Sequence, residues 1–190
     1  MQNTFLDNSL KSLSLKNPPI FDKQEHDKYV KDWREQYVGE AVAVLRPVDT
    51  KEVSEILKFA YKNGVDVVPQ GGNTSLCGAA TPDKTGKSIV ISLEKMTNVR
   101  AFNKKANTIT VDSGIILSRI HEIVEAENLF FPLSLGAKGS CMIGGNLSTN
   151  AGGVNALKYG NTRELCLGLE IVLPNGEIMN ILSELKKDNT

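Results

Sequence analysis

Two stretches of the chain combine glycines with hydroxyl and amide side chains, a composition that suits an anionic or nucleotide ligand. The longer stretch, residues 131–153 (FPLSLGAKGSCMIGGNLSTNAGG), carries six of the chain's 16 glycines. Each glycine costs backbone entropy on folding, so this concentration indicates a main chain that bends sharply or approaches something closely. Backbone N–H groups freed by such bends form a concave surface of donors for phosphate oxygens. A tight structural turn packed under a sheet explains the same glycines, and this stretch alone leaves both interpretations open.

The shorter stretch, residues 70–75 (QGGNTS), directly follows the apolar run at residues 65–69. Open α/β layers place ligands at the carboxyl ends of their strands. Because a second glycine loop exists in the same chain, ligand contact is favoured here over a simple turn. If residues 143–147 open a short helix, its N-terminal amides and its dipole add to the preference for phosphate.

Other nucleotide and metal motifs are excluded. Residues 86–88 (GKS) end like a phosphate loop, but Thr81 occupies the position of its first glycine and an apolar strand follows instead of a helix. No G-x-G-x-x-G sequence occurs. With two histidines, His26 and His121, and three widely spaced cysteines, neither a metal site nor a disulfide framework is expected. We expect His121 to have a surface or capping role.

Composition limits the classes of partner. The 190 residues carry a formal net charge of zero, so nothing indicates nucleic acid or an anionic membrane surface as a partner. No apolar run approaches the roughly 20 residues that a transmembrane helix needs. The first residues lack the apolar core of a signal peptide. These features predict a cytoplasmic protein in a reducing compartment.

The hydrophobic pattern predicts alternating strands and helices. We expect residues 1–20 to form a loosely held arm and residues 28–37 a short helix with Trp33 in the core. A strand at 41–46, a helix from an N-cap at Thr50 to a stop at Gly64, and a strand at 65–69 form a crossover unit. The remaining expected elements are a strand at 89–91, a hairpin of 99–102 with 108–111, a helix at 117–128, and strands at 165–173 and 178–182 joined through an Asn-Gly turn.

At this point the two glycine stretches resemble a known family. Residues 67–83 (VVPQGGNTSLCGAATPD) and 131–153 are similar to the two FAD-contacting loops of the vanillyl-alcohol-oxidase-type (PCMH-type) flavoproteins. Within them, the chain resembles the D-2-hydroxy-acid dehydrogenases: D-lactate dehydrogenase, the glycolate oxidase D subunit and D-2-hydroxyglutarate dehydrogenase. The resemblance implies an α+β fold, a two-lobed PCMH-type FAD-binding domain that is C-terminally incomplete. Its parts would be an N-terminal arm at 1–29 and α/β lobes at 30–93 and 94–190.

The resemblance also implies the residues that contact the cofactor. Main-chain amides of residues 71–76 would cradle the pyrophosphate, and the longer stretch would complete the contacts to the ribityl chain and the isoalloxazine. The expected contact residues are Gln70, Gly71, Gly72, Asn73, Thr74, Ser75, Leu76, Pro132, Ser134, Gly139, Ser140, Ile143, Gly144, Gly145, Asn146, Thr149, Asn150, Gly152 and Gly153.

Three departures from the family pattern matter. Gln70 stands where the family usually has arginine, and Ser75 where it usually has glycine. Some relatives tether the flavin through a histidine in this loop, but here Asn73 occupies the loop and no histidine does, so we expect non-covalent FAD. The family's next FAD-contacting loop and its C-terminal cap domain, which supplies catalytic and metal-binding residues, have no counterpart. No catalytic residue and no metal ligand are therefore assigned.

The resemblance implies the FAD-binding portion of an oxidoreductase that moves a hydride from a D-2-hydroxy acid to flavin N5. A cap domain would bind the small-molecule substrate, and a separate acceptor would take the electrons. The main alternative is a truncated remnant or split half that binds FAD weakly and has no catalysis of its own. A reductase of an enolpyruvyl group in a peptidoglycan precursor ranks lower. Peripheral membrane association through a cap stays open.

Overall fold

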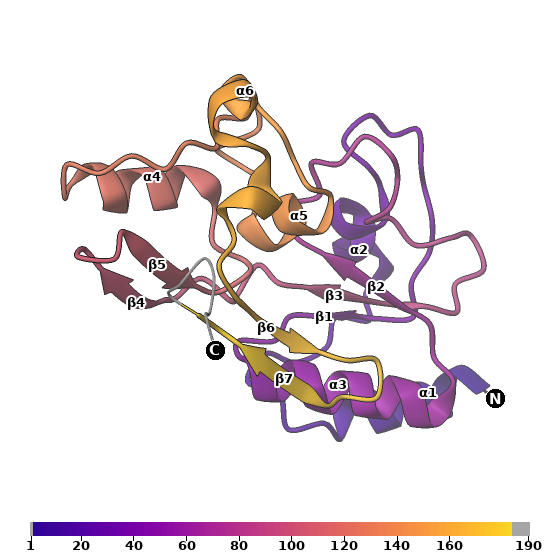
Figure 1. Ribbon diagram of the computed structural model, residues 1–190. Coiled ribbons are helices and arrows are strands. Elements are labelled where there is room, and N and C mark those ends of the chain that lie inside the picture. The colour runs from indigo at the N-terminus through magenta and orange to yellow at the C-terminus, as the bar shows by residue number, and fades with distance from the viewer. Residues whose placement is uncertain (1, 184–190) are drawn as a thin grey trace. The chain divides into compact units, whose positions relative to one another are not determined.

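The computed structural model describes the backbone of residues 2–183 and the side chains of residues 6–183 (Figure 1). The chain divides into two compact units. Unit 1 comprises Met1–Lys95 and Val172–Ile178, and unit 2 comprises Met96–Ile171 and Met179–Thr190. Residues 184–190 of the predicted second lobe lie outside the described residues. No helix within the described range has the length and apolar character of a membrane span.

Unit 1 is built on a three-stranded parallel sheet with the order β1-β3-β2. Its strands are β1 (Val44–Leu45), β2 (Val67–Gln70) and β3 (Ile89–Ser92). The crossover from β1 to β2 was predicted, but β3 inserts between the two strands and pairs with both. The carboxyl ends of all three strands therefore meet at one edge of the sheet.

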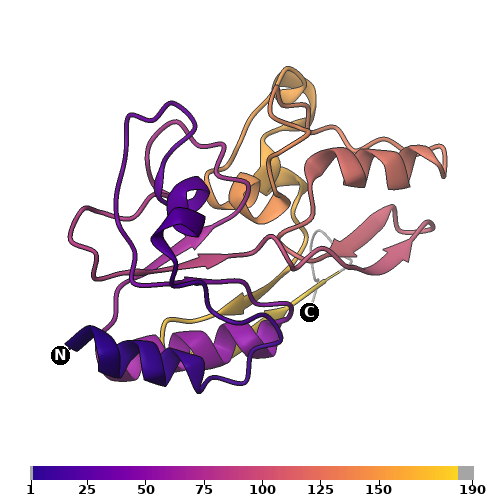
Figure 2. The same cartoon turned by 180° about the vertical axis from the view of Figure 1, so that it is seen from behind.

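Helices cover both faces of this sheet. The helices α1 (Gln2–Lys11) and α3 (Thr50–Asn63) lie on one face, and α2 (Lys23–Val30) lies on the other (Figures 1 and 2). Alternate strand residues serve the two layers: Leu45 packs toward α1 and α3, whereas Val44 packs toward α2. Both faces of a parallel sheet need such cover because its strands are apolar on both sides.

The N-terminal segment is packed, contrary to the loosely held arm that was predicted. Leu10 of α1 has no exposed surface and belongs to the core of unit 1. Leu6, one turn before Leu10 on α1, packs against the same core, and so does Leu13, which follows the helix. Ile20 then pairs with Val44 at the edge of the sheet.

The predicted helix at 28–37 is wrong, because α2 begins earlier and ends at Val30. The Asp32 carboxylate accepts hydrogen bonds from the amides of Arg34 and Tyr37, which stabilises a turn in place of a helix. Trp33, predicted in the core, is 73% exposed in this turn. The apolar residues in 28–37 have helical spacing, but the hydrogen bonds of Asp32 hold the second half of this segment in a turn.

The helix α3 follows the prediction closely. It ends at Gly64, whose φ of 62° is the left-handed conformation that favours glycine. Its N-cap is Asp49, one residue before the predicted Thr50, and the Asp49 carboxylate accepts from the Glu52 amide. An aspartate in this position satisfies one of the orphan donors of the first turn.

Unit 2 contains the predicted hairpin and helix. The strands β4 (Val99–Asn103) and β5 (Thr108–Val111) pair antiparallel, and α4 (Leu117–Glu125) packs in the same core. The buried residues of this core are Ile115, Leu117, Ile120, Val124, Leu133, Cys141 and Ile143. The longer glycine stretch therefore contributes apolar residues to the core as well as exposed ones.

The remaining helices and strands of the chain are short. The helices α5 (Ile143–Ser148) and α6 (Ala156–Tyr159) and the 3-10 helix η1 (Thr162–Leu165) precede a hairpin of β6 (Leu169–Val172) and β7 (Ile178–Ile181). The predicted strand at 165–173 starts only at Leu169, since η1 occupies its first position. The predicted turn is confirmed, and Gly176 has a φ of 82°.

Candidate functional site

The first glycine loop leaves the carboxyl end of β2 with its main-chain donors unused. Among residues 2–183, none of the amides from Gly71 to Leu76 finds a hydrogen-bond acceptor. The residues from Gly71 to Ser75 are half-buried, and Leu76 is exposed. Unpartnered, partly buried N–H groups need an external acceptor. Six in succession suit a ligand with several oxygens, such as a diphosphate.

Asn73 holds this loop in place. Its φ is 50°, a left-handed conformation that asparagine tolerates. Its side-chain Nδ2 donates to the carbonyl of Lys31 at 2.6 Å and to that of Lys28 at 3.3 Å, at the end of α2. These are carbonyls that a helix end leaves without partners. The side chain of Asn73 is therefore committed to the fold, while its amide stays available.

Gln70 is also committed to the fold. It is only 2% exposed, and its Nε2 donates to the carbonyls of Tyr29 and Ala80 at 2.8 and 2.7 Å. The side chain thus joins the end of β2 to α2 and to the segment after the loop. A neutral amide provides both donors without burying a charge, which gives a physical reason for glutamine at this position.

Ser75 has a partner that the sequence did not single out. Its Oγ lies 3.0 Å from the Sγ of Cys77, an exposed thiol. This hydrogen bond, aided by the Ala79 amide, places the pKa of the Cys77 thiol below its ordinary value. The signal for Cys77 was present in the sequence as a hydroxyl two residues before a cysteine in a glycine loop.

The second stretch forms α5, the short helix that the sequence left as a condition, but most of the donors at its start are occupied. The amide of Ile143 donates to the Ile115 carbonyl at 3.0 Å, and that of Gly144 to the Ser113 carbonyl at 2.8 Å. Of these first amides, only that of Gly145 lacks an acceptor in the described part of the chain. Of the N-terminal amides that the sequence offered to a phosphate, this helix start therefore leaves only that of Gly145 available.

The glycines of this stretch fall into two classes. A Cβ at Gly144 would lie 2.7 Å from the Cβ of Ser113, and one at Gly153 would collide with the Ser134 carbonyl. These glycines are required by packing within unit 2. By contrast, a Cβ at Gly139 or Gly145 would meet nothing within 4 Å. Packing does not require glycine at these two positions, and the open space beside them is free for a ligand.

Asn146 carries a buried acceptor without a partner. The residue is 6% exposed, and its Oδ1 accepts no hydrogen bond from the residues that the structure describes. Buried polar atoms are rarely left in this state, so a donor from outside the described chain is expected. The adjacent Cys141 thiol is buried, and burial raises its pKa.

Two more predicted contact residues use their side chains locally. Asn150, with a φ of 50°, accepts at Oδ1 from the Arg163 amide at 3.1 Å. Thr149 donates from Oγ1 to the Gly145 carbonyl at 2.9 Å. The hydrogen bond between Asn150 and Arg163 helps to close the turn that follows α5. A Cβ at Gly152 would lie 2.5 Å from the Asn161 Oδ1, so packing requires glycine there.

The other predicted positions differ in exposure. The Pro132 carbonyl accepts from Nδ2 of Asn155 at 3.1 Å, and Ser134 is half-buried. Ser140 is exposed in the turn before α5. The Ile143 side chain belongs to the core of unit 2. Residues 70–76 lie in unit 1 and the positions from Pro132 to Gly153 lie in unit 2.

Comparison with known proteins identifies long relatives. The chain is 40% identical to the D-2-hydroxyglutarate–pyruvate transhydrogenase of Saccharomyces cerevisiae over 179 residues, which cover 93% of this chain and 36% of the relative. It is 40% identical to the mitochondrial D-2-hydroxyglutarate dehydrogenase of Bos taurus over 171 residues, covering 90% of this chain and 31% of that protein. The chain thus spans about a third of the length of these curated relatives.

Solved structures share the fold. An alkyldihydroxyacetonephosphate synthase superposes with a TM-score of 0.81 at 20% identity, covering 92% of this chain and 34% of that one. The 6-hydroxy-D-nicotine oxidase of Arthrobacter nicotinovorans superposes with a TM-score of 0.75 at 20% identity, covering 88% and 36%. The predicted α+β PCMH-type fold is confirmed.

The family match includes both glycine loops. The family described as FAD binding domain matches residues 41–182, which is most of the chain. The predicted cofactor, FAD, is the ligand for which this family is named. The chain belongs to the FAD binding domain family.

Proposed function

We propose that this chain holds FAD non-covalently through its two glycine loops and forms the flavin-binding part of an oxidoreductase acting on a D-2-hydroxy acid. The carrying observation is the run of amides from Gly71 to Leu76 that lack acceptors in the described chain. The names of the curated relatives, which include D-2-hydroxyglutarate dehydrogenases, support the substrate class. The absence of histidine from residues 70–76 supports a non-covalent cofactor.

The residues present fit the cofactor. Amides of residues 71–76 bind the diphosphate, and the open space beside Gly139 and Gly145 admits the flavin end. The unpartnered Oδ1 of Asn146 accepts a hydrogen bond from a hydroxyl or N–H of the cofactor. FAD, when bound, supplies a hydride acceptor for the substrate α-carbon. The role of this chain is to bind the cofactor and to orient it.

Substrate recognition is proposed to rest on polypeptide beyond these residues. The curated relatives are about three times as long as the matched region, which supports a further substrate-binding part and a separate electron acceptor in the complete protein. We assign no catalytic residue and no metal ligand on this chain. Assays of the complete protein with D-2-hydroxyglutarate, D-lactate and glycolate identify which hydroxy acid is the substrate.

A flavin assay tests the proposal directly. The purified chain is desalted, its bound chromophore is released by heat, and the chromophore is identified by chromatography. We expect FAD in near-stoichiometric amount, released without a covalent adduct. A folded chain that retains no flavin, even after reconstitution with excess FAD, contradicts the proposed role of the loops.

A second candidate, FAD binding without turnover by a remnant or split half, is supported by exposed apolar side chains. Leu157 and Val154 are 104% and 84% exposed, and Phe130 beside Tyr159 is 61% exposed. Large exposed apolar side chains favour association when they gather into a patch. This candidate is favoured if no hydroxy acid reduces the bound flavin, either in the chain alone or in the chain with its downstream coding sequence restored.

The compartment is a separate proposal. The sequence predicted a cytoplasmic protein, whereas the bovine and zebrafish relatives are named mitochondrial. Cell fractionation of the tagged, complete protein decides between the two compartments and tests for peripheral membrane association.

A further inference from the structure

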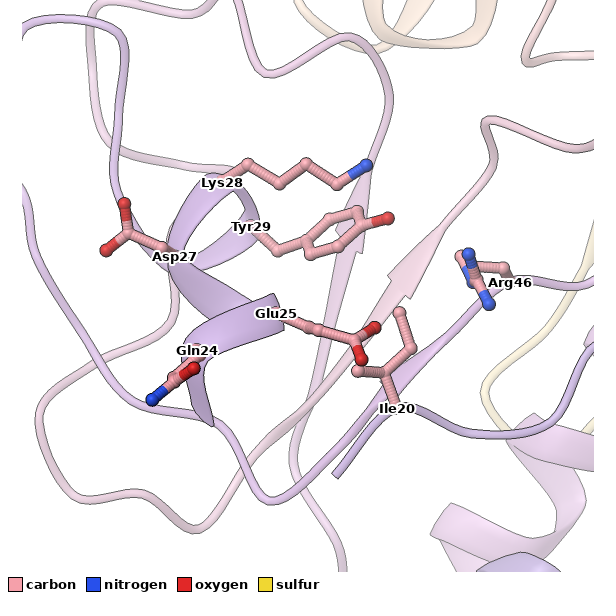
Figure 3. A pocket seen from close by; sticks show the side chains of 7 residues that line it. All are labelled: Ile20, Gln24, Glu25, Asp27, Lys28, Tyr29 and Arg46. Atoms are coloured by element: carbon pink, nitrogen blue, oxygen red, sulfur yellow. The ribbon is translucent and has the colours of Figure 1, made fainter. Parts of the chain in front are cut away.

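An open pocket lies in unit 1 at the carboxyl edge of its sheet, and it adjoins the first glycine loop through the Asn73 bond to the Lys28 carbonyl. Its volume is about 380 Å³, within the range of roughly 300–1,000 Å³ that small-molecule sites occupy. Its walls come from α2 and from Arg46, the residue that follows β1. Its lining residues are Ile20, Gln24, Glu25, Asp27, Lys28, Tyr29 and Arg46 (Figure 3).

The two cations of this pocket, Arg46 and Lys28, carry more N–H donors than there are protein acceptors near them. Arg46 Nη1 and Lys28 Nζ lie 3.9 and 3.7 Å from the two oxygens of Glu94, distances that are too long for hydrogen bonds. The Tyr29 hydroxyl donates to Glu94 at 2.9 Å. Arg46 Nε is buried, and no acceptor for it exists among the described residues. Two cations therefore share one carboxylate without making a hydrogen bond to it.

The side chains are arranged toward one side of α2. Lys28 and Tyr29 extend in the same direction, and the Lys28 ammonium lies 4.6 Å from the centre of the Tyr29 ring, a cation–π contact that steadies it (Figure 3). Asp27 points to the opposite side of α2 in Figure 3 and pairs with Lys31 at 2.6 Å.

Two further carboxylates line the pocket: Asp27, which pairs with Lys31, and Glu25, which is exposed. Water and salt screen the charges of Glu25 and of Lys28, which is also exposed, so the net charge of the pocket does not by itself select an anion. A planar guanidinium with a free, buried N–H favours an oxyanion, either a carboxylate or a phosphate.

We propose that the pocket formed by Arg46, Lys28 and Tyr29 binds the carboxylate or phosphate group of a small organic anion. The anion accepts from Arg46 Nε and from the Lys28 ammonium, and the ring of Tyr29 and the side chain of Ile20 form the apolar wall beside it. Glu94 competes with the anion for both cations and so lowers its affinity. This site does not depend on the proposed flavin chemistry.

The test uses the full 190-residue chain, isotope-labelled and saturated with FAD, titrated with inorganic phosphate at constant ionic strength. The Nε–Hε signal of Arg46 reports this pocket, and the amides of residues 71–76 report the glycine loop. We expect a saturable shift of the Arg46 signal. A parallel titration with acetate distinguishes a carboxylate from a phosphate preference.

Substitutions in the pocket are expected to change the dissociation constant of the anion in opposite directions. Lys28→Gln and Arg46→Gln each raise the dissociation constant about tenfold, the loss expected for one charge-assisted hydrogen bond. Glu94→Gln lowers the constant several-fold because it removes the competing carboxylate. The matched control is Lys23→Gln, an exposed lysine of α2 outside the pocket, which leaves the constant within about twofold.

Several results would overturn the proposal. It fails if neither anion moves the Arg46 signal in the parent chain and in Glu94→Gln, or if the shifts occur only in residues 71–76. Equal losses in Lys23→Gln and Lys28→Gln would mean unspecific attraction. Thermal unfolding shows whether Arg46→Gln folds. If it does not, the opposite changes in the dissociation constant expected for Lys28→Gln and Glu94→Gln still test the proposal.

Discussion

Gly145 and Gly153 belong to one stretch, yet the structure gives them opposite reasons for being glycine. A Cβ at Gly145 points into open space, so Gly145→Ala is expected to stabilise α5 by up to about 1 kcal/mol. The same methyl group occupies space proposed for FAD, and overpacking of about 1–3 kcal/mol weakens FAD binding by roughly ten- to hundredfold. Thermal unfolding and FAD titration measure the two effects separately.

Gly153→Ala is the matched control for this substitution. Its Cβ would collide with the Ser134 carbonyl, so we expect a loss of about 3 kcal/mol in the free energy of unfolding. If Gly145→Ala keeps full FAD affinity, the flavin does not approach this glycine.

The Cys77 thiol offers a pH-dependent readout of the first loop. The Ser75 Oγ lies 3.0 Å from the sulfur, and a hydrogen bond from this hydroxyl to the thiolate favours the charged form, which lowers the pKa of Cys77. Ser75→Ala raises this pKa and slows alkylation by iodoacetamide at neutral pH, because only the thiolate reacts. Mass spectrometry of alkylation across a pH series gives the midpoint.

Ser75→Thr retains the hydroxyl and is expected to keep the low midpoint. Cys141 is an internal reference, since it is buried and burial raises its pKa. An unchanged midpoint in Ser75→Ala would show that the hydrogen bond does not set the reactivity.

The hairpin of β4 and β5 depends on a buried carboxylate. Asp112, 3% exposed, accepts from Arg100 Nε at 2.6 Å and from the amide and side chain of Asn98. Asp112→Ala leaves these donors without their acceptor and is expected to lower the free energy of unfolding by about 3 kcal/mol. Urea unfolding followed by circular dichroism measures the change.

The control for this prediction lies in the same hairpin. Lys104 pairs with Glu127 at 3.0 Å on the surface, and Lys104→Ala is expected to cost at most about 0.5 kcal/mol. Similar costs for Asp112→Ala and Lys104→Ala would contradict the structural role of the buried pair.

For the entire chain, FAD binding is expected to protect both glycine loops from hydrogen exchange. The amides of residues 71–76 and of Gly145 lack acceptors in the described chain and gain them on binding. At a free FAD concentration of about 100 times the dissociation constant, the gain in stability is about 2.7 kcal/mol. Exchange measured by mass spectrometry resolves the two segments.

ADP provides the comparison ligand. It carries the diphosphate without the isoalloxazine, so it is expected to protect residues 71–76 and to leave Gly145 unprotected. If FAD protects only residues 71–76, the second stretch does not contact the cofactor.

Short-range sequence signals predicted much of this protein correctly. The stop of α3 at Gly64, the turn at Gly176, and the hairpin of β4 and β5 follow from periodicity and turn chemistry. The local composition of the two glycine loops pointed to an anion cradle, and their resemblance to a known family implied FAD. The interactions that determine these features lie within a few residues of one another, so the sequence displays them directly.

Other features depend on contacts between distant residues, and only the tertiary structure reveals them. The insertion of β3 between β1 and β2 depends on pairing across 20 residues or more. The carbonyls of Ser113 and Ile115 occupy amides at the start of α5, a loss of donors that no local pattern displays. The packing of segments far apart in the chain also determines which glycines are required by packing. It likewise brings Arg46 and Lys28 to the same carboxylate, that of Glu94.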